Sequence, residues 1–507
     1  MLDRRRFLQS LAAGTVSTAF PLWAQPRFAS NPFTLGVASG YPSPSSIVLW
    51  TRLMGDLGAQ SIPVRWEIAR DEGFRAIAQS GTIEADPEWA HSARVEAQGL
   101  EPDRWYWYRF MAGDAASPVG RTRTAPAAGS AAQRLRFAFA SCQHYEQGYF
   151  NAYRHIVADQ PDLVAFLGDY IYEASWGRDL VRSHGAPEAF TLQDYRARHA
   201  LYKSDPDLQA AHSACPWIVT WDDHEVENDY ADDLSQFRTP KEKFLARRAA
   251  AYRAYYEHMP LPPRMRPDGA RMRLHAELAW GTLARFYLLD DRQYRSYHAC
   301  RRLWRAGEGR AVDVDQCPEL ARPTRSMLGR AQERWLEHAL GASRTAWNIL
   351  AQQTMMAQLD QKPGPGRIAW TDGWDGYPAA RRRLLDFLFE KRISNPVVIG
   401  GDVHYFSVSQ LKPDFDDPAS PVVASEFVGT SITSQAWPQE RLDQYRPGNP
   451  HVLLADSRYR GYVRVEVTPK RWLAELRAME SVRTREAACN TLASFAVEEG
   501  KPGPLRA

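Results

Sequence analysis

The 507-residue sequence contains no long hydrophobic run, and no stretch approaches the roughly 20 apolar residues that a membrane-spanning helix needs. It also lacks a strong charge of one sign, because 63 Lys and Arg residues stand against 60 Asp and Glu residues, a formal net charge of +3. No basic run is long enough to follow a phosphate backbone. These absences exclude an integral membrane protein and disfavour nucleic-acid binding as the main role.

Cysteine is scarce, and the odd number of five leaves at least one thiol outside any intrachain disulfide. Cys300 and Cys317 flank a short loop and could pair in an oxidising compartment, and a pair between Cys215 and Cys489 is a further option. Cys-x-x-Cys and haem-attachment motifs are absent, as is a Gly-x-Gly-x-x-Gly turn after a strand. The sequence therefore does not indicate an exported redox protein.

The N-terminus has the residue order of an export signal. Arg4 to Leu8 read Arg-Arg-Arg-Phe-Leu, which resembles a twin-arginine signal, and a weakly apolar run over 11–23 leads to small residues near Ala24. We expect residues 1–24 to be a twin-arginine signal peptide, with the twin-arginine export machinery as partner and a periplasmic or secreted destination. A frayed basic tail is the alternative.

The composition is typical of a folded chain, and the length predicts about two to four domains. Of the residues, 44% are hydrophobic, 24% charged and 12% aromatic, which excludes a disordered or fibrous protein. Over 31–125, short runs such as the aromatic 105–110 are separated by Gly, Pro and Asp, and this spacing predicts a small β-sandwich. The Leu-Glu-Pro run at 100–102 resembles the corner of fibronectin-like modules.

After a linker at 122–132, strands alternate with helices, which predicts an α/β catalytic domain over residues 134–480. The 230–390 region reads as largely helical, and we expect it to be an insertion or cap. Residues 481–507 are expected to form a C-terminal segment.

Four apolar strands of this domain each end at side chains that can bind a metal or exchange a proton. Loops at the carboxyl ends of strands converge in α/β sheets, so these side chains are expected to lie together. One Asp after a strand is commonly a turn residue or a helix cap, but four such ends are hard to explain in that way. Carboxylates and imidazoles are the donors that a dinuclear metal site requires. The candidates are Cys142, Asp169, Asp223, His224, Asp402 and His404.

Two of the candidate positions have plainer interpretations when taken alone. A thiol such as that of Cys142 is more often a buried apolar group than a ligand. Tyr172, three residues after Asp169, would ordinarily be a packed aromatic, and its phenolate becomes a ligand only beside a strongly acidic cation such as ferric iron.

The motifs at the strand ends resemble those of the PhoD-type alkaline phosphatases, a family of the calcineurin-like metallophosphoesterases. The resemblance extends to residues 194–199, 327–332 and 427–433 and covers nearly the whole mature chain. The strand-end motifs are Phe-Ala-Ser-Cys-Gln at 139–143, Leu-Gly-Asp-Tyr-Ile-Tyr-Glu at 167–173, Thr-Trp-Asp-Asp-His-Glu-Val at 220–226 and Gly-Asp-Val-His-Tyr at 401–405.

The resemblance implies an αββα metallophosphatase sandwich preceded by a fibronectin-like β-sandwich. It implies that Asp169 bridges two metals, an Fe(III) and a Ca(II), with zinc or another divalent metal as the alternative. The remaining implied ligands are Cys142, Tyr172 and His404 for the iron, and Asp223 and Asp402 for the calcium.

The same resemblance implies roles for further residues. His224 would hydrogen-bond the phosphate or the leaving oxygen. Family members often carry two Asn where this chain has Asn228 and Asp229, so Asn228 is a candidate metal ligand and the role of Asp229 stays open. Arg248, or Arg247 beside it, is a candidate phosphate ligand, and a solvated helix face is the alternative for either.

The activity implied is that of an exported alkaline phosphatase and phosphodiesterase, in which a metal-bound hydroxide attacks small phosphate esters. Two alternatives stay open. One is a phospholipase-D-like esterase acting on phospholipid or teichoic-acid diesters, and the other is a non-catalytic exported binding protein with the same fold.

Overall fold

The computed structural model describes residues 27–302 and 309–507. The predicted signal peptide, residues 1–24, lies outside them. Within these ranges no helix combines the length and the apolar character that crossing a membrane requires.

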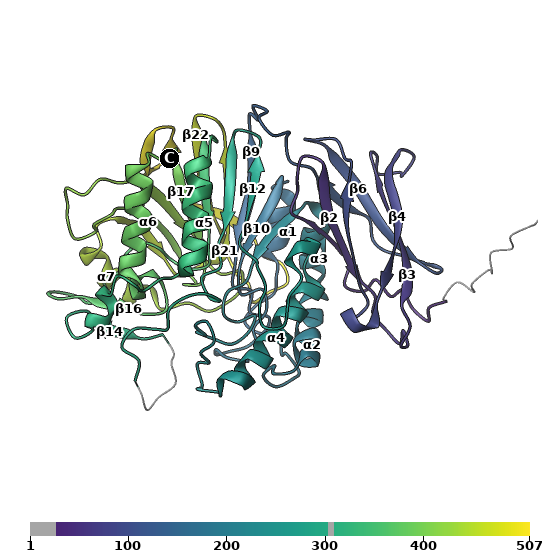
Figure 1. Ribbon diagram of the computed structural model, residues 1–507, viewed down its shortest axis with the longest axis horizontal. Coiled ribbons are helices and arrows are strands. Elements are labelled where there is room, and N and C mark those ends of the chain that lie inside the picture. Colours follow the sequence, from purple (N-terminus) through teal and green to yellow (C-terminus); the bar gives the residue numbers. More distant parts are fainter. Residues whose placement is uncertain (1–26, 303–308) are drawn as a thin grey trace, which may run out of the picture.

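The N-terminal module is a β-sandwich, as predicted (Figure 1). In β6 the side chains of Tyr106, Tyr108 and Phe110 are buried while their neighbours are half-buried, the alternation expected of a strand with one face on a core. One sheet contains β1 (Val37–Gly40), β2 (Ser46–Arg52) and β5 (Ser92–Gln98), and the other contains β3 (Ile62–Ala69), β4 (Ile77–Ala85), β6 (Trp105–Ala112), β7 (Ala115–Ala116) and β8 (Gly120–Arg123).

The first sheet of the catalytic part has ten strands, in the order β24-β23-β22-β21-β9-β10-β11-β1-β2-β5. Its parallel centre is β9 (Leu135–Ala140), β10 (Leu163–Leu167) and β11 (Trp217–Thr220). Because β1 pairs with β11, the sandwich and the catalytic part share one sheet. The antiparallel strands on the other side are β21 (Arg460–Val467), β22 (Arg471–Met479), β23 (Cys489–Glu498) and β24 (Lys501–Arg506).

These last strands correct the predicted boundary at residue 480. Residues 481–507 are not a separate segment, because β23 pairs with β22 and β24 with β23 at the edge of the first sheet.

The second sheet has seven strands and corrects the predicted helical insertion at 230–390. Three of its strands, β12, β13 and β15, fall inside that region. Each has only five residues, and a short apolar run does not distinguish a buried strand from part of a helix. In spatial order the strands are β12 (Ala276–Trp280), β13 (Ala284–Leu288), β15 (Trp347–Ala351), β17 (Pro396–Gly400), β19 (Ala424–Val428), β18 (Phe406–Leu411) and β20 (Val452–Asp456).

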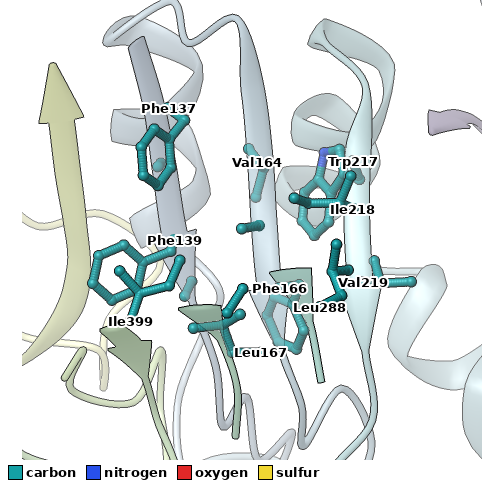
Figure 2. Close-up of a cluster of buried hydrophobic side chains, with 14 of the residues drawn as sticks. Phe137, Phe139, Val164, Phe166, Leu167, Trp217, Ile218, Val219, Leu288 and Ile399 are labelled. Carbon is teal, nitrogen blue, oxygen red and sulfur yellow. The ribbon is translucent and has the colours of Figure 1, made fainter. Parts of the chain in front are cut away.

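The two sheets pack face to face and helices cover them, which confirms the predicted αββα sandwich (Figure 1). The rings of Phe137 and Phe286 meet edge to face between the sheets, 5.2 Å apart. Figure 2 shows Phe137 and Phe139 of the first sheet with Leu288 and Ile399 of the second. Burying such side chains stabilises the fold by about 1.5–3 kcal/mol each.

The helices divide between the two sheets. Against the first sheet pack α1 (Ala152–Ala158), α2 (Leu192–Lys203), α3 (Pro206–Ala214) and α4 (Lys241–His258). Against the second pack α5 (Gly329–Ala342) and α6 (Pro378–Glu390). The short α7 (Gln439–Tyr445) precedes β20, and β14 (Ala311–Asp313) pairs with β16 (Ile368–Trp370) in a small separate ribbon.

Candidate metal centre and cavity

Two glycines allow the ends of the strands to converge. Gly168 follows β10 with φ +104°, and a Cβ at this position would lie 2.5 Å from Cβ of Asp222. Gly401 follows β17, and a Cβ there would lie 2.6 Å from Cβ of Ser141. Only glycine permits these approaches, which carry the loops after β10 and β17 against those after β11 and β9.

The backbone is strained where the predicted ligands lie. Cys142, Asp169, Asp402 and His404 have φ angles of 59°, 57°, 65° and 60°, in the left-handed region that non-glycine residues seldom occupy. Such strain costs on the order of 1–3 kcal/mol per residue and clusters at functional sites. Its presence at four predicted ligands supports a functional role for this edge of the sheets.

The structure brings together the four side chains that were expected to hold iron. Ligand atoms of Cys142, Asp169 and His404 lie within 4.8 Å of one another. The Tyr172 hydroxyl donates to Oδ2 of Asp169 at 2.9 Å and lies 3.2 Å from Nε2 of His404. Because Nδ1 of His404 donates to the carbonyl oxygen of Gln435 at 2.7 Å, its Nε2 is the nitrogen left for a metal.

A set of carboxylates adjoins these residues. Ligand atoms of Asp169, Asp223 and His224 lie within 4.8 Å of one another, as do those of Asp223, Asp229 and Asp372. The fifth carboxylate, Asp402, accepts a hydrogen bond from Thr354 at 2.7 Å. The position that the sequence left open, Asp229, therefore contributes an oxygen next to Asp223.

One buried arginine offsets part of this negative charge. Arg292 donates to both oxygens of Asp372 at 2.9 Å and to Asp222, and it lies 3.7 Å from Asp223 and 3.9 Å from Asp402. Arg292 follows β13 and was not predicted, because that strand lay within the presumed helical region.

The residues present fit a bound cation. Oδ1 of Asp169 is buried and has no hydrogen-bond partner within the described part of the chain. Burial and the charges of Asp223, Glu225 and Asp402, opposed by His224, raise the pKa of Asp169 well above its usual range. Burial likewise raises the pKa of Asp402 to about 6. A cation would satisfy the free oxygen and relieve the mutual repulsion of these carboxylates.

His224 lies beside the candidate metal ligands in a fixed orientation. Its Nδ1 donates to Oε2 of Glu173 at 2.7 Å, and its ring packs on Tyr172 with centroids 4.2 Å apart. Burial alone would lower the pKa of His224, but Glu173, Asp223 and Asp169 raise it well above its usual value. Glu173 also accepts the backbone N–H of Asn228 at 2.9 Å, so one carboxylate orients both neighbours.

These groups form the floor of a cavity of about 540 Å³. Asp169, Asp223, His224, Asp402 and His404 line it, as do Asn228 and Asp229. Much of the remaining lining is aromatic, and it was not predicted from the sequence. These aromatic residues are Trp176, Phe237, Trp370, Trp374, Tyr405 and Trp437.

Neither candidate arginine lines this cavity, and the expected phosphate ligand is corrected accordingly. Arg248 donates to the carbonyl oxygens of Asp232 and Ala270, at 2.7 and 3.0 Å. Arg247 pairs with Glu227 at 2.7 Å and with Glu188 at 2.8 Å. Both side chains are buried in helix α4 packing, where these partners occupy their guanidinium groups.

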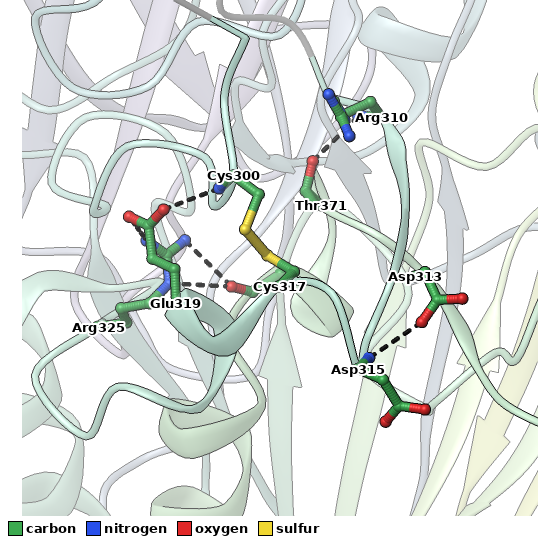
Figure 3. The surroundings of a disulfide bond; sticks show 9 residues. Cys300, Arg310, Asp313, Asp315, Cys317, Glu319, Arg325 and Thr371 are labelled. Carbon is green, nitrogen blue, oxygen red and sulfur yellow. Dashed lines mark hydrogen bonds and ion pairs between the residues drawn. A yellow bond between two sulfur atoms is a disulfide. The ribbon is translucent and has the colours of Figure 1, made fainter.

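A disulfide links Cys300 and Cys317, which confirms the predicted pairing (Figure 3). Cys215 and Cys489 are free thiols, so the second pair considered from the sequence is wrong. Gly309, which lies between Cys300 and Cys317 in the sequence, donates its backbone N–H to Oδ2 of Asp229 at 2.8 Å.

Comparisons with known proteins agree with this architecture. Residues 137–476 match the model for PhoD-like phosphatases, and residues 16–126 match the model for the N-terminal domain of PhoD-like phosphatases. Alkaline phosphatase D of Bacillus subtilis (strain 168) is 46% identical over an alignment of 525 residues, which covers 99% of this chain and 88% of the relative. The solved structure of PhoD superposes with a TM-score of 0.90 at 46% identity, over 95% of this chain and 93% of that one.

Proposed function

Because the chain belongs to the PhoD-like phosphatase family, we propose that it is an exported, metal-dependent phosphatase and phosphodiesterase acting on small phosphate esters. The observation that carries this proposal is the convergence of Asp169, Asp223, Asp402 and His404 at the floor of one cavity. A complete set of ligand types at the base of a cavity favours catalysis over a non-catalytic binding protein.

We assign the two halves of the centre to different metals. Cys142, Tyr172 and His404 would hold Fe(III), because ferric iron accepts thiolate, phenolate and imidazole together. Asp223 and Asp402 would hold Ca(II), a hard cation that takes oxygen ligands. Asp169 would bridge the two, with Asn228 and Asp229 as further oxygen donors beside calcium.

When bound, the metals supply Lewis acidity toward the phosphoryl oxygens and lower the pKa of water. The protein's own contribution is positioning. Glu173 accepts from Nδ1 of His224, which lines the cavity, and leaves Nε2 for a hydrogen bond with the phosphoryl or leaving oxygen. Arg292, behind the carboxylates, fixes Asp372 and lies close to Asp223.

The export route is proposed from the residue order at Arg4 to Leu8. The Cys300–Cys317 disulfide is consistent with it, since such bonds persist in oxidising compartments. Replacing Arg4 and Arg5 with Lys should leave the precursor in the cytoplasm, and efficient export of that variant would exclude a twin-arginine route.

The proposed function is tested by metal analysis together with turnover. Freshly isolated protein should contain iron and calcium and should hydrolyse 4-nitrophenyl phosphate and bis(4-nitrophenyl) phosphate. A metal-loaded preparation that hydrolyses neither ester would refute the assignment.

A further inference from the structure

We propose that the aromatic wall of the cavity binds the organic part of the substrate and selects phosphate esters whose alcohol carries a flat, uncharged aromatic group. The aromatic wall is defined as Trp176, Trp370, Tyr405 and Trp437, all of which line the cavity. The inference rests on the proposed function, and it adds the substrate class to it.

The wall begins at the metal ligands. The ring of Trp176 stacks on that of His404, with centroids 5.9 Å apart and planes inclined by 8°. Tyr405 directly follows His404 in the chain, and Trp370 lies two residues before Asp372. The aromatic wall and the candidate metal ligands therefore line one cavity, in which the ester group of a bound phosphate would be within reach of the rings.

The rings of the aromatic wall meet one another at different angles, and two of the indoles are partly accessible. Trp370 and Trp437 meet edge to face at 6.4 Å and 82°, and Tyr405 lies 6.3 Å from Trp437 at 34°. Trp370 and Trp437 are only half-buried, so part of each indole faces open space. The guanidinium of Arg441 lies 4.6 Å from the centre of the Trp437 ring and helps to hold it.

The charges around the cavity favour an uncharged aromatic group over the other groups that the aromatic wall could bind. No described residue that lines the cavity is Lys or Arg, and Arg441, which lies against Trp437, is not among the lining residues. The described lining therefore presents no cation to a second phosphate. The two lining acids away from the metal ligands are neutralised: Glu188 pairs with Arg247 at 2.8 Å and Asp375 with Arg381 at 2.6 Å. A quaternary ammonium group would therefore find aromatic faces but no uncompensated carboxylate beside them.

The size of the cavity agrees with an ester larger than a simple alkyl phosphate. Its volume of about 540 Å³ lies within the range of roughly 300–1,000 Å³ typical of sites for drug-sized ligands. Buried aromatic pairs add specific stabilisation beyond the area they cover, which provides the basis for discrimination.

The test compares two diesters that share one leaving group. Benzyl 2,2,2-trifluoroethyl phosphate and methyl 2,2,2-trifluoroethyl phosphate both release trifluoroethanol, which is not aromatic, so a difference in kcat/KM reports the second ester group alone. We expect the wild-type enzyme to prefer the benzyl ester at least tenfold. Trp437→Leu and Trp370→Leu should each lower this preference by about 2- to 12-fold, the range that one aromatic contact supports.

Two variants serve as controls. Trp437→Phe keeps an aromatic face and should retain most of the preference. Trp105→Leu removes a half-buried indole from the N-terminal sandwich, far from the cavity lining, and should leave the ratio unchanged. Equal kcat/KM values for the two diesters in the wild-type enzyme, or equal effects of Trp437→Leu and Trp105→Leu on their ratio, would overturn the inference.

Binding of non-hydrolysable phosphonates separates this inference from the proposed function. Phenylphosphonate should bind the metal-loaded protein more tightly than methylphosphonate by calorimetry, and Trp437→Leu should reduce that difference. If no ester is hydrolysed but phenylphosphonate binds more tightly than methylphosphonate, the proposed function is contradicted and the inference about the aromatic wall is supported. If the two phosphonates bind equally, the aromatic wall is refuted whatever the enzyme hydrolyses.

Discussion

At the scale of single residues, we assign different roles to neighbouring groups of the candidate centre, Asp169 as a metal ligand and His224 as a group that acts on substrate. Asp169 is buried among other carboxylates with one oxygen unpartnered within the described chain, whereas His224 is oriented by Glu173 at the cavity floor. The two side chains lie in the same cluster, yet substitutions at them should have different consequences.

Asp169→Asn should lose both bound metal and activity, because an amide is a poorer bridging ligand than a carboxylate. Elemental analysis of the purified variant, with turnover of 4-nitrophenyl phosphate, provides the measurement. Full metal content with normal turnover would exclude a bridging role.

His224→Ala should retain the metals and lose about 10²- to 10⁴-fold in kcat, the usual effect of removing a positioned acid–base group. The same pair of measurements applies. Loss of metal from this variant would instead make His224 a ligand.

Tyr172 gives an optical test of the iron assignment. A phenolate or thiolate bound to Fe(III) transfers charge to the metal and absorbs visible light, so the purified protein should be coloured. Tyr172→Phe should shift or bleach the band, and a calcium-selective chelator should remove activity while the colour remains. A colourless, iron-free and fully active protein would contradict this assignment.

Individual residues of the site also differ in how far they could be predicted from the sequence. Cys142, Asp169, Asp223 and His404 were predictable because each follows an apolar strand. The contacts of Arg248 could not be predicted in this way, because the position of an arginine on a helix does not indicate which groups it binds.

At the scale of elements, the loops after the strands decide whether the centre forms. Gly168→Ala should destabilise the protein, because φ +104° is unfavourable for alanine and the new Cβ would overlap Asp222. The cost should be about 1 kcal/mol for the conformation and a further 1–3 kcal/mol for the overlap.

Gly129→Ala is the matched control for Gly168→Ala. Gly129 also has a left-handed φ, +79°, but a Cβ there would meet nothing within 4 Å. Denaturant unfolding of both variants should show the larger loss at Gly168, and equal losses would show that close packing is not what requires the glycine.

The elements themselves were only partly predictable. The parallel strands β9, β10 and β11 of the first sheet were identified because polar Ser-Cys, Gly-Asp and Asp-Asp turns mark their ends. Strands β12, β13 and β15 were missed because each has only five residues. β12 and β13 form a local hairpin, but the pairing of β13 with β15 and of β15 with β17 joins segments far apart in the sequence, which local patterns do not record. Because β13 was missed, Arg292 was not identified as a candidate. The residues of the aromatic wall show no sequence periodicity from which the wall could have been predicted.

At the scale of the whole molecule, buried histidines behind the first sheet should make the fold sensitive to acid. Burial lowers the pKa values of His199, His212 and His258 well below 6.5, and neither ring nitrogen of His199 has a described hydrogen-bond partner. Because the folded state disfavours protonation, stability should be complete above about pH 6.5 and fall as the pH drops below it.

Thermal unfolding at pH 7.5 and 5.5 measures this effect, and His199→Phe provides the comparison. The variant keeps a ring next to His258 and Tyr255 but has no group to protonate, so its loss of Tm between the two pH values should be smaller. An identical loss in both proteins would assign the acid sensitivity to other groups, such as the metal ligands.

The proposed export route and the Cys300–Cys317 disulfide together imply an order of events during maturation. Under that route the chain folds in a reducing cytoplasm, which keeps Cys300 and Cys317 as thiols. Oxidation after export would then link the chain on either side of Gly309, whose backbone N–H donates to Asp229. The redox state of this one cysteine pair would thus record, molecule by molecule, which side of the membrane each copy has reached.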